Sequence, residues 1–293
     1  MLENRTPTPT LGVVHKRGSM DLAVEMIHAT VQLEQPLGDG TRTVGTGFLI
    51  SAPGPEGQPR VVLITANHVF QKMPGANARI GYRIANKDGS WSYSPQTLKI
   101  RDGDGRELWT HHPDRDVAAI SVTAPPQFAR AALPLSYLAS DGTFEMFRVD
   151  AGEEMMALGF PRGLSANGAG FPILRAGRVA SFPLGPAKIF PTFLLDFSVF
   201  PGNSGGPVFF TRASKLGAVS VDEDGLDPGF IAGLLTQEVE PNNERLGIGV
   251  VTHAKYVRET IALLQDPMAV STVASGEQVD GAKAVAADDA SRD

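Results

Sequence analysis

Short apolar runs alternate with turn residues along most of the chain, a pattern typical of β-strands. The run at 61–65 is almost entirely apolar and predicts a strand buried on both faces. Because no helical pattern separates these runs, we expect barrels rather than a parallel sheet covered by helices. Strands are predicted at 26–34, 43–51, 61–65, 78–84, 96–102, 116–122, 154–160, 173–181, 192–199, 206–211, 229–237 and 246–252.

One helix is predicted late in the chain, over 253–265. Val257, Ile261 and Leu264 fall at helical spacing and form a single apolar stripe that would dock on the body of the protein. Pro267 follows closely and is typical of a helix end.

The two ends of the chain differ in composition from the middle. Residues 1–20 are polar and contain prolines, so we expect a flexible extension over 1–24. Residues 267–293 are rich in Ala, Asp, Ser and Gly, and we expect them to be disordered. A folded domain is therefore expected over 25–266.

No apolar run is long enough for a membrane span, and the N-terminal stretch has no signal-peptide core. Residence in the cytoplasm is therefore expected, although a trimmed leader would overturn this expectation. A net charge of −6 makes nucleic acid an unexpected partner. The chain contains no cysteine, which excludes disulfides and thiolate metal sites.

The string Pro-Gly-Asn-Ser-Gly-Gly-Pro at 201–207 is the strongest chemical signal. Acyl transfer needs a serine oxygen on a tight turn and backbone N–H groups that converge on the developing oxyanion. Gly202 permits the backbone conformation that points its N–H inward. Ser204 is thus the predicted nucleophile, and the N–H groups of Gly202 and Ser204 are the predicted oxyanion hole.

A histidine and an aspartate accompany this serine. His68 follows the buried strand at 61–65, so a rigid element would hold it as a general base. Asp116 precedes an apolar strand and could orient that histidine; Asp114 competes for this role but follows Pro113 in a turn. Each residue alone is more often structural, and only the combination favours catalysis. The order His, Asp, Ser argues against a lipase or esterase of the α/β-hydrolase class.

Four motifs together resemble the trypsin-like peptidases, and among them the bacterial HtrA/DegP-type branch. They are GTGFLIS (45–51), TANHV (65–69), DRDVA (114–118) and PGNSGGPVF (201–209). The resemblance implies two six-stranded antiparallel barrels with a C-terminal helix and an active site between them. It also implies a serine endopeptidase that cleaves a protein or peptide substrate through an acyl-enzyme, without metal or cofactor.

Two departures from family patterns bear on control of the activity. Asn203 stands where digestive members have an aspartate that pairs with a new N-terminus, so control should come from loop rearrangement or a regulatory protein partner. HtrA-type proteins usually carry a PDZ domain of about 90 residues. Because 27 residues follow Asp266, we expect none here.

The resemblance also suggests a primary specificity pocket. Ser198 should lie near its base, with Thr236 and Gly249 as walls. Ser198 carries no charge, so small or apolar P1 residues are expected; Glu238 at the rim would instead favour a basic residue.

Other readings are weaker. Adjacent His111 and His112 would point opposite ways on an extended chain, which argues against a metal site. The acidic segment 222–224 indicates a solvated loop, with calcium binding as the weaker alternative.

The alternative function is a catalytically silent member of the fold that acts in binding or regulation, and a serine-reactive probe separates it from a peptidase.

Overall fold

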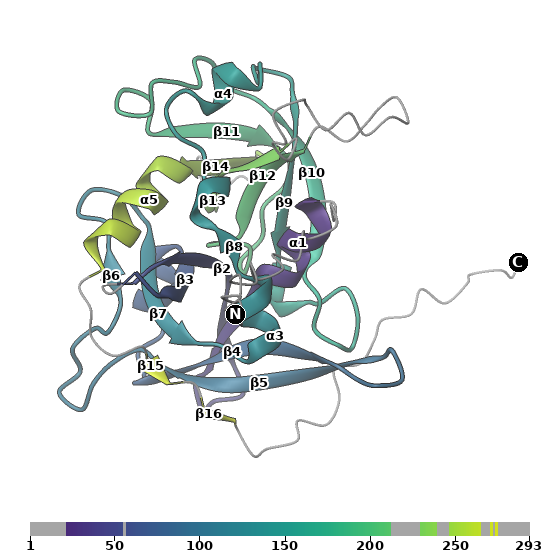
Figure 1. Cartoon of the computed structure of the whole chain (residues 1–293), viewed down its shortest axis with the longest axis vertical. Coiled ribbons are helices and arrows are strands. Elements are labelled where there is room, and N and C mark those ends of the chain that lie inside the picture. Colours follow the sequence, from purple (N-terminus) through teal and green to yellow (C-terminus); the bar gives the residue numbers. More distant parts are fainter. Residues whose placement is uncertain are drawn as a thin grey trace, which may run out of the picture.

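The computed structural model describes residues 22–54, 57–211, 229–238, 246–264, 270–271 and 273–274. Most of its strands belong to two units, one above the other in Figure 1. The lower unit is a sheet in which the six long strands run in the order β7-β3-β2-β1-β4-β5, each antiparallel to its neighbour. These strands are β1 (Thr30–Pro36), β2 (Arg42–Pro53), β3 (Pro59–Thr65), β4 (Asn77–Ala85), β5 (Trp91–Lys99) and β7 (Ala118–Thr123).

Four two-residue strands complete this sheet. The strand β6 (Thr110–His111) pairs with β7, and β8 (Leu133–Pro134) lies parallel to β2. The strand β15 (Val270–Ser271) pairs with β7 at one edge, whereas β16 (Val273–Ala274) pairs with β5 at the other. A segment this short reaches both edges only if the sheet is rolled, so β15 and β16 mark the seam of the first barrel.

The upper unit is a closed barrel of six antiparallel strands in the order β10-β11-β14-β13-β12-β9. Together with the helix that follows β14, the two units confirm the predicted all-β architecture. The ladder of the first unit, unlike that of the second, is not closed by direct pairing of its long edge strands. The strands of the closed barrel are β9 (Glu154–Gly159), β10 (Ile173–Val179), β11 (Thr192–Asp196), β12 (Pro207–Thr211), β13 (Gly229–Glu238) and β14 (Ile248–His253).

The predicted C-terminal helix is present as α5 (Ala254–Leu263), which lies beside both units in Figure 1. Val257 and Ile261 are buried, as the apolar stripe predicted, and α5 contacts β13 and β7. The structure also contains short helices that the apolar pattern did not predict. These are α1 (Leu22–Ala29), α2 (Asn67–Gln71), α3 (Pro126–Ala131) and α4 (Thr143–Met146), with 3-10 turns η1 (Leu135–Tyr137) and η2 (Pro161–Gly163).

Helix α1 corrects the sequence prediction at the start of the first strand. Residues 26–29 were expected to be extended, but they are helical, and Met26 and Ala29 are fully buried. The buried Arg83 donates to the carbonyl oxygens of Ile27, His28 and Thr30. The last carbonyls of a helix lack partners within it, so Arg83 satisfies the C-terminal end of α1. This long-range contact is invisible to the local pattern.

The ends of the chain were predicted as a flexible extension and a disordered tail. Helix α1 begins inside the expected extension 1–24, and residues 1–21 lie outside the described residues. Four residues of the expected tail 267–293 pair with the sheet as β15 and β16, because sheet edges offer unpaired backbone groups. The other residues of that tail lie outside the described part.

Candidate active site

His68 and Asp116 lie in contact although 48 residues separate them in the chain. Strands β3 and β7 are antiparallel neighbours, with Thr65 opposite Ala118. His68 follows β3 in the first turn of α2, and Asp116 precedes β7, so the strand pairing brings the two side chains together. The backbone N–H of His68 donates to Asp116 Oδ1 at 2.9 Å, and His68 Nδ1 lies 2.6 Å from Oδ2.

These contacts fix both the orientation and the charge of Asp116. Burial raises the pKa of this carboxyl, but the hydrogen bonds and the charge of His68 together outweigh burial and hold the pKa below its usual value. Asp116 is therefore ionised at neutral pH. A carboxylate on Nδ1 holds the Nδ1–H tautomer and leaves Nε2 as the ring acceptor. Asp114, the rejected alternative, instead donates its backbone N–H to His112 Nδ1 at 3.1 Å.

The turn before Ser204 has the geometry that the Pro-Gly sequence favours. The N–H of Asn203 donates to Phe200 O at 3.0 Å across Pro201 and Gly202, and Gly202 has φ of +97°. Proline at the second position and glycine with positive φ at the third are typical of a type II turn. A Cβ on Gly202 would overlap the carbonyl oxygen of Phe160, so glycine is required for space as well as conformation.

The direction of the Gly202 N–H follows from the carbonyl of the same peptide. Pro201 O accepts a hydrogen bond from the N–H of Arg162 at 2.6 Å. In a planar trans peptide the C=O and N–H point to opposite sides, so the Gly202 N–H points away from Arg162. Among the described residues the Gly202 N–H donates to no group. This N–H is free to meet an oxyanion.

The glycines after Ser204 let the turn pass between the two barrels. Gly205 has φ of +84°, and a Cβ there would overlap Thr46 O and Thr65 Oγ1 of the first barrel. The same Cβ would lie 2.9 Å from the N of Ala66, directly before α2. A Cβ on Gly206 would overlap Leu158 O of the second barrel. The turn that contains Ser204 thus packs closely against the start of the helix that carries His68.

Thr46 holds this turn in place, and sequence reasoning missed its role. Its Oγ1 donates to Gly202 O at 2.7 Å and accepts the N–H of Phe160 at 3.2 Å. Its backbone N–H donates to Ser204 O at 2.9 Å. The glycines on either side of Thr46 in the 45–51 motif were the available signal, since a Cβ on Gly45 would overlap Val69 and a Cβ on Gly47 would overlap Leu63.

Ser204 itself is half-buried, and its Oγ lies 3.5 Å from Thr236 O, a long hydrogen bond. Among the described residues no hydrogen bond joins Ser204 Oγ to His68. The structure therefore brings His68 and Asp116 together and places the Ser204 turn against α2, without a direct bond between serine and histidine.

The three residues predicted to form a pocket lie around the segment that precedes the Ser204 turn. Ser198 is exposed in this segment. Thr236, in β13, is buried and donates to Val250 O at 3.3 Å. Gly249, in β14, leaves room for Val199, whose Cγ2 would lie 2.8 Å from a Cβ at that position. The side chain of Glu238, the alternative rim residue, lies outside the described residues.

Two arginines that the sequence analysis did not consider flank the same segment. Arg175 donates to Ser198 O, and its guanidinium lies 5.2 Å from the Phe197 ring centre and 5.5 Å from that of Phe200. The guanidinium of Arg162 lies 5.6 Å from the Phe200 ring. Their positive charge stands beside the predicted pocket, which disfavours a basic residue there.

The histidines at 111 and 112 have protein partners. His112 Nε2 lies 3.1 Å from Glu259 Oε2, and its ring packs edge-on against Tyr256. His111 Nδ1 lies 3.2 Å from His112 O. No group of three histidine or acidic side chains that could hold a metal occurs in the described part of the chain. Residues 222–224 lie outside it.

The sequence model of the trypsin-like peptidase domain matches residues 45–219, which include His68, Asp116 and Ser204. The chain belongs to this family. The family match covers more than half of the chain and agrees with the two-barrel fold. In the trypsin-like peptidase described here, no helix of the described residues is long and apolar enough to cross a membrane. No curated protein sequence matches the chain significantly.

Several solved structures resemble this peptidase at low identity. A variant of the HtrA-type protease AlgW with a tripeptide is 17% identical, with a TM-score of 0.48 over 83% of this chain and 62% of that one. The peptidase thus spans less than two thirds of that AlgW chain. AlgW with a decapeptide is 16% identical, with a TM-score of 0.46 over 83% and 66% of the two chains. The protease Anisep from Arthrobacter nicotinovorans is 16% identical, with a TM-score of 0.46 over 80% and 93%.

Proposed function

We propose that this peptidase is a serine endopeptidase that cleaves protein or peptide substrates through His68, Asp116 and Ser204. Ser204 Oγ attacks the substrate carbonyl carbon while His68 Nε2 takes its proton. The N–H groups of Gly202 and Ser204 stabilise the oxyanion, and the imidazolium then protonates the leaving amine. Water, deprotonated by the same nitrogen, hydrolyses the acyl-enzyme and restores Ser204.

The bond between His68 and Asp116 is the observation that carries this proposal. Both carboxylate oxygens of Asp116 are engaged by His68, through its backbone N–H and its Nδ1. The Nδ1 contact fixes the tautomer that leaves Nε2 as an acceptor, and the backbone bond holds the carboxylate in place, as a general base requires. The free Gly202 N–H supports the proposal independently, because it supplies an oxyanion donor on the nucleophile turn.

The long bond from Ser204 Oγ to Thr236 O favours the second candidate, a silent member of the fold that acts in binding. A serine that remains bound there would not be activated by His68. Movement of the Ser204 side chain toward Nε2 is therefore part of the endopeptidase proposal, and a substrate or a regulatory protein partner is its expected trigger.

A fluorophosphonate probe tests the proposal. The wild-type chain should be labelled on Ser204, as located by peptide mass spectrometry. Ser204→Ala should abolish labelling, and His68→Ala should slow labelling and casein cleavage by about 10³-fold or more. The controls Ser94→Ala and His111→Gln change the same residue types outside the site and should behave as wild type.

Absence of Ser204 labelling, both alone and with denatured protein substrates present, would favour the binding module. Labelling that is equally fast in wild type and His68→Ala would contradict the role of His68 as general base. Asp116→Asn tests the role of the third residue. Loss of the carboxylate should lower the rate of labelling, and the label should still be found on Ser204.

A further inference from the structure

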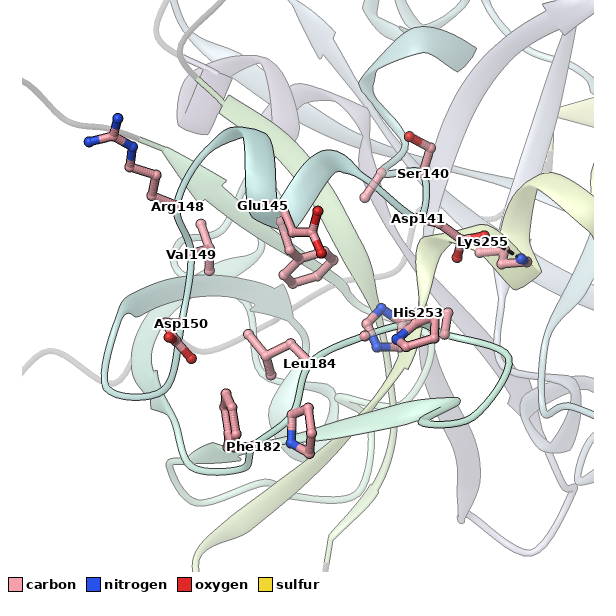
Figure 2. Close-up of a pocket in the computed structure, with 16 residues that line it drawn as sticks. Ser140, Asp141, Glu145, Arg148, Val149, Asp150, Phe182, Leu184, His253 and Lys255 are labelled. Atoms are coloured by element: carbon pink, nitrogen blue, oxygen red, sulfur yellow. Dashed lines mark hydrogen bonds and ion pairs between the residues drawn. The ribbon is translucent and has the colours of Figure 1, made fainter.

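A pocket of about 620 Å³ opens on the second barrel, and it shares no residue with the proposed active site (Figure 2). Three segments form it: residues 139–150 with α4, the 182–187 loop between β10 and β11, and the junction of β14 with α5. Its volume suits a ligand the size of a few side chains. The proposed proteolytic mechanism uses none of the residues that line this pocket.

The charge of the pocket is negative. The carboxylates of Asp141, Glu145 and Asp150 line it. Lys255 Nζ lies 2.6 Å from Asp141 Oδ2 and neutralises one of them. Arg148, the other cation of the lining, points away from the other labelled side chains in Figure 2. In the part of the chain that the structure describes, no cation pairs with Glu145 or Asp150.

His253 adds an unused hydrogen-bond acceptor at one end of the pocket, beside Leu184 and Lys255 in Figure 2. The residue is 3% exposed, and its buried Nε2 has no hydrogen-bond partner among the residues that the structure describes. Burial lowers the pKa of His253 to about 4, so the ring is neutral at neutral pH, while the charge of Asp141 and a hydrogen bond to the Leu184 backbone oppose this shift. A hydrogen bond that raises the pKa is one that the ring donates. Because Nε2 has no partner within the described part of the chain, Nδ1–H is the donor and Nε2 of the neutral ring carries a lone pair.

Most of the remaining wall of the pocket is apolar. Phe144 and Val149 are buried on one side of it, and the buried Leu184 of the 182–187 loop lines it as well. Phe182 is 74% exposed at the edge, an unusual exposure for a large aromatic side chain. The pocket therefore combines hydrogen-bond acceptors and negative charge with an apolar surface.

We propose that this pocket binds a peptide segment in which an arginine or lysine stands beside an aromatic or aliphatic residue. The cationic side chain would place its N–H donors on Glu145 and Asp150, with His253 Nε2 as a neutral acceptor. The apolar neighbour would pack on Leu184 and Phe182. Donor-rich, positively charged ligands suit these groups, because no cation in the described residues pairs with the charges of Glu145 and Asp150. The segment belongs to a partner protein, which binds here rather than in the active site.

Calorimetric titration tests the proposal on the full chain with Ser204→Ala, so that no peptide is cleaved. The probes are the peptide acetyl-Gly-Phe-Arg-Leu-Gly-amide and the same peptide with citrulline, which keeps the shape of arginine but removes its charge. The arginine peptide should bind with a dissociation constant below about 1 mM and the citrulline peptide roughly tenfold more weakly. Glu145→Gln with Asp150→Asn should weaken arginine-peptide binding about tenfold, while the exposed control Glu107→Gln should not change it.

Equal affinity for the two peptides, or affinity unchanged in the double variant, would overturn the proposal. If free arginine methylamide bound as tightly as the peptide, the occupant of the pocket would be a small cationic molecule and not a peptide segment, and the proposal would be wrong. A ¹⁵N NMR spectrum gives a second readout, since the His253 Nε2 signal should shift on addition of the arginine peptide and stay in place with the citrulline peptide. Because Ser204→Ala removes catalysis, failure here leaves the endopeptidase proposal untouched.

Discussion

At the scale of single residues, His253 shows how burial alone changes the chemistry of a side chain. Its ring lies 5.2 Å from that of Phe144 and 5.0 Å from that of Phe193, in surroundings that cannot solvate a charge. Burial lowers its pKa from the usual 6.5 to about 4. The nearby Asp141 raises the pKa but does not restore it. A histidine that stays neutral in the folded state makes stability depend on pH.

The sign of this dependence follows from proton uptake. Between pH 6.5 and 4 the unfolded chain binds a proton at His253 that the folded chain does not, so the free energy of unfolding should fall as the pH falls through this range. The shift corresponds to a loss of roughly 3 kcal/mol. Urea unfolding at several pH values should therefore show a smaller acid loss for His253→Gln than for wild type. The exposed control His111→Gln should keep more of the wild-type loss, and identical profiles for His253→Gln and wild type would contradict the prediction.

At the scale of elements, Arg83 shows how one buried cation fixes a helix. Besides the α1 carbonyls, it donates to Gly170 O at 3.1 Å, and its guanidinium lies 4.8 Å from the Phe171 ring centre. Burial lowers its pKa to about 10, so it remains charged at neutral pH. Four backbone oxygens from two separate segments thus depend on one side chain of β4.

Arg83→Met should therefore release α1 and lower the free energy of unfolding by about 3–5 kcal/mol, because it leaves buried carbonyl oxygens without donors. Hydrogen exchange of the α1 amides should accelerate more than that of β12. The exposed Arg106→Met should change stability by about 0.5 kcal/mol or less. If the α1 amides of Arg83→Met exchanged hydrogen at the wild-type rate, another contact would be holding this helix.

At the scale of the whole molecule, the proposed active site exists only where the two barrels meet. His68 and Asp116 come from the first barrel, whereas Ser204 leads into β12 of the second. Thr46 and Gly205 hold the two surfaces at hydrogen-bonding distance from each other. The spacing between barrels therefore decides whether the three side chains can act together.

Gly205→Ala tests this dependence against a matched control. Gly205 and Gly89 both have φ of +84°, but a Cβ at Gly89 meets no atom within 4 Å. Both substitutions carry the cost of a left-handed alanine, about 1–2 kcal/mol, and only Gly205→Ala also forces the barrels apart. Urea unfolding should show at least about 2 kcal/mol more destabilisation for Gly205→Ala, and its fluorophosphonate labelling should slow strongly. Equal stability of the two variants would mean that the interface adapts freely.

Features that depend on neighbours in the chain could be predicted from the sequence. Alternating apolar runs indicated the strands, and the stripe with Val257 and Ile261 indicated α5, because burial of one face imposes a period. Pro201 and Gly202 likewise specify their turn through their own backbone preferences. The pairing of His68 with Asp116 was a hypothesis from motifs, and no local preference could have shown their contact.

The amino-acid sequence by itself therefore determined the strands, the final helix and the turn that presents Ser204. The tertiary structure decided which distant groups meet. The β3–β7 pairing joins His68 to Asp116, Arg83 caps the end of α1, and Thr46 joins the Ser204 turn to the first barrel. It also assembled the acidic pocket at His253 from three separate segments. The physical reason is that these contacts gain their energy only after strand pairing has brought remote parts of the chain together.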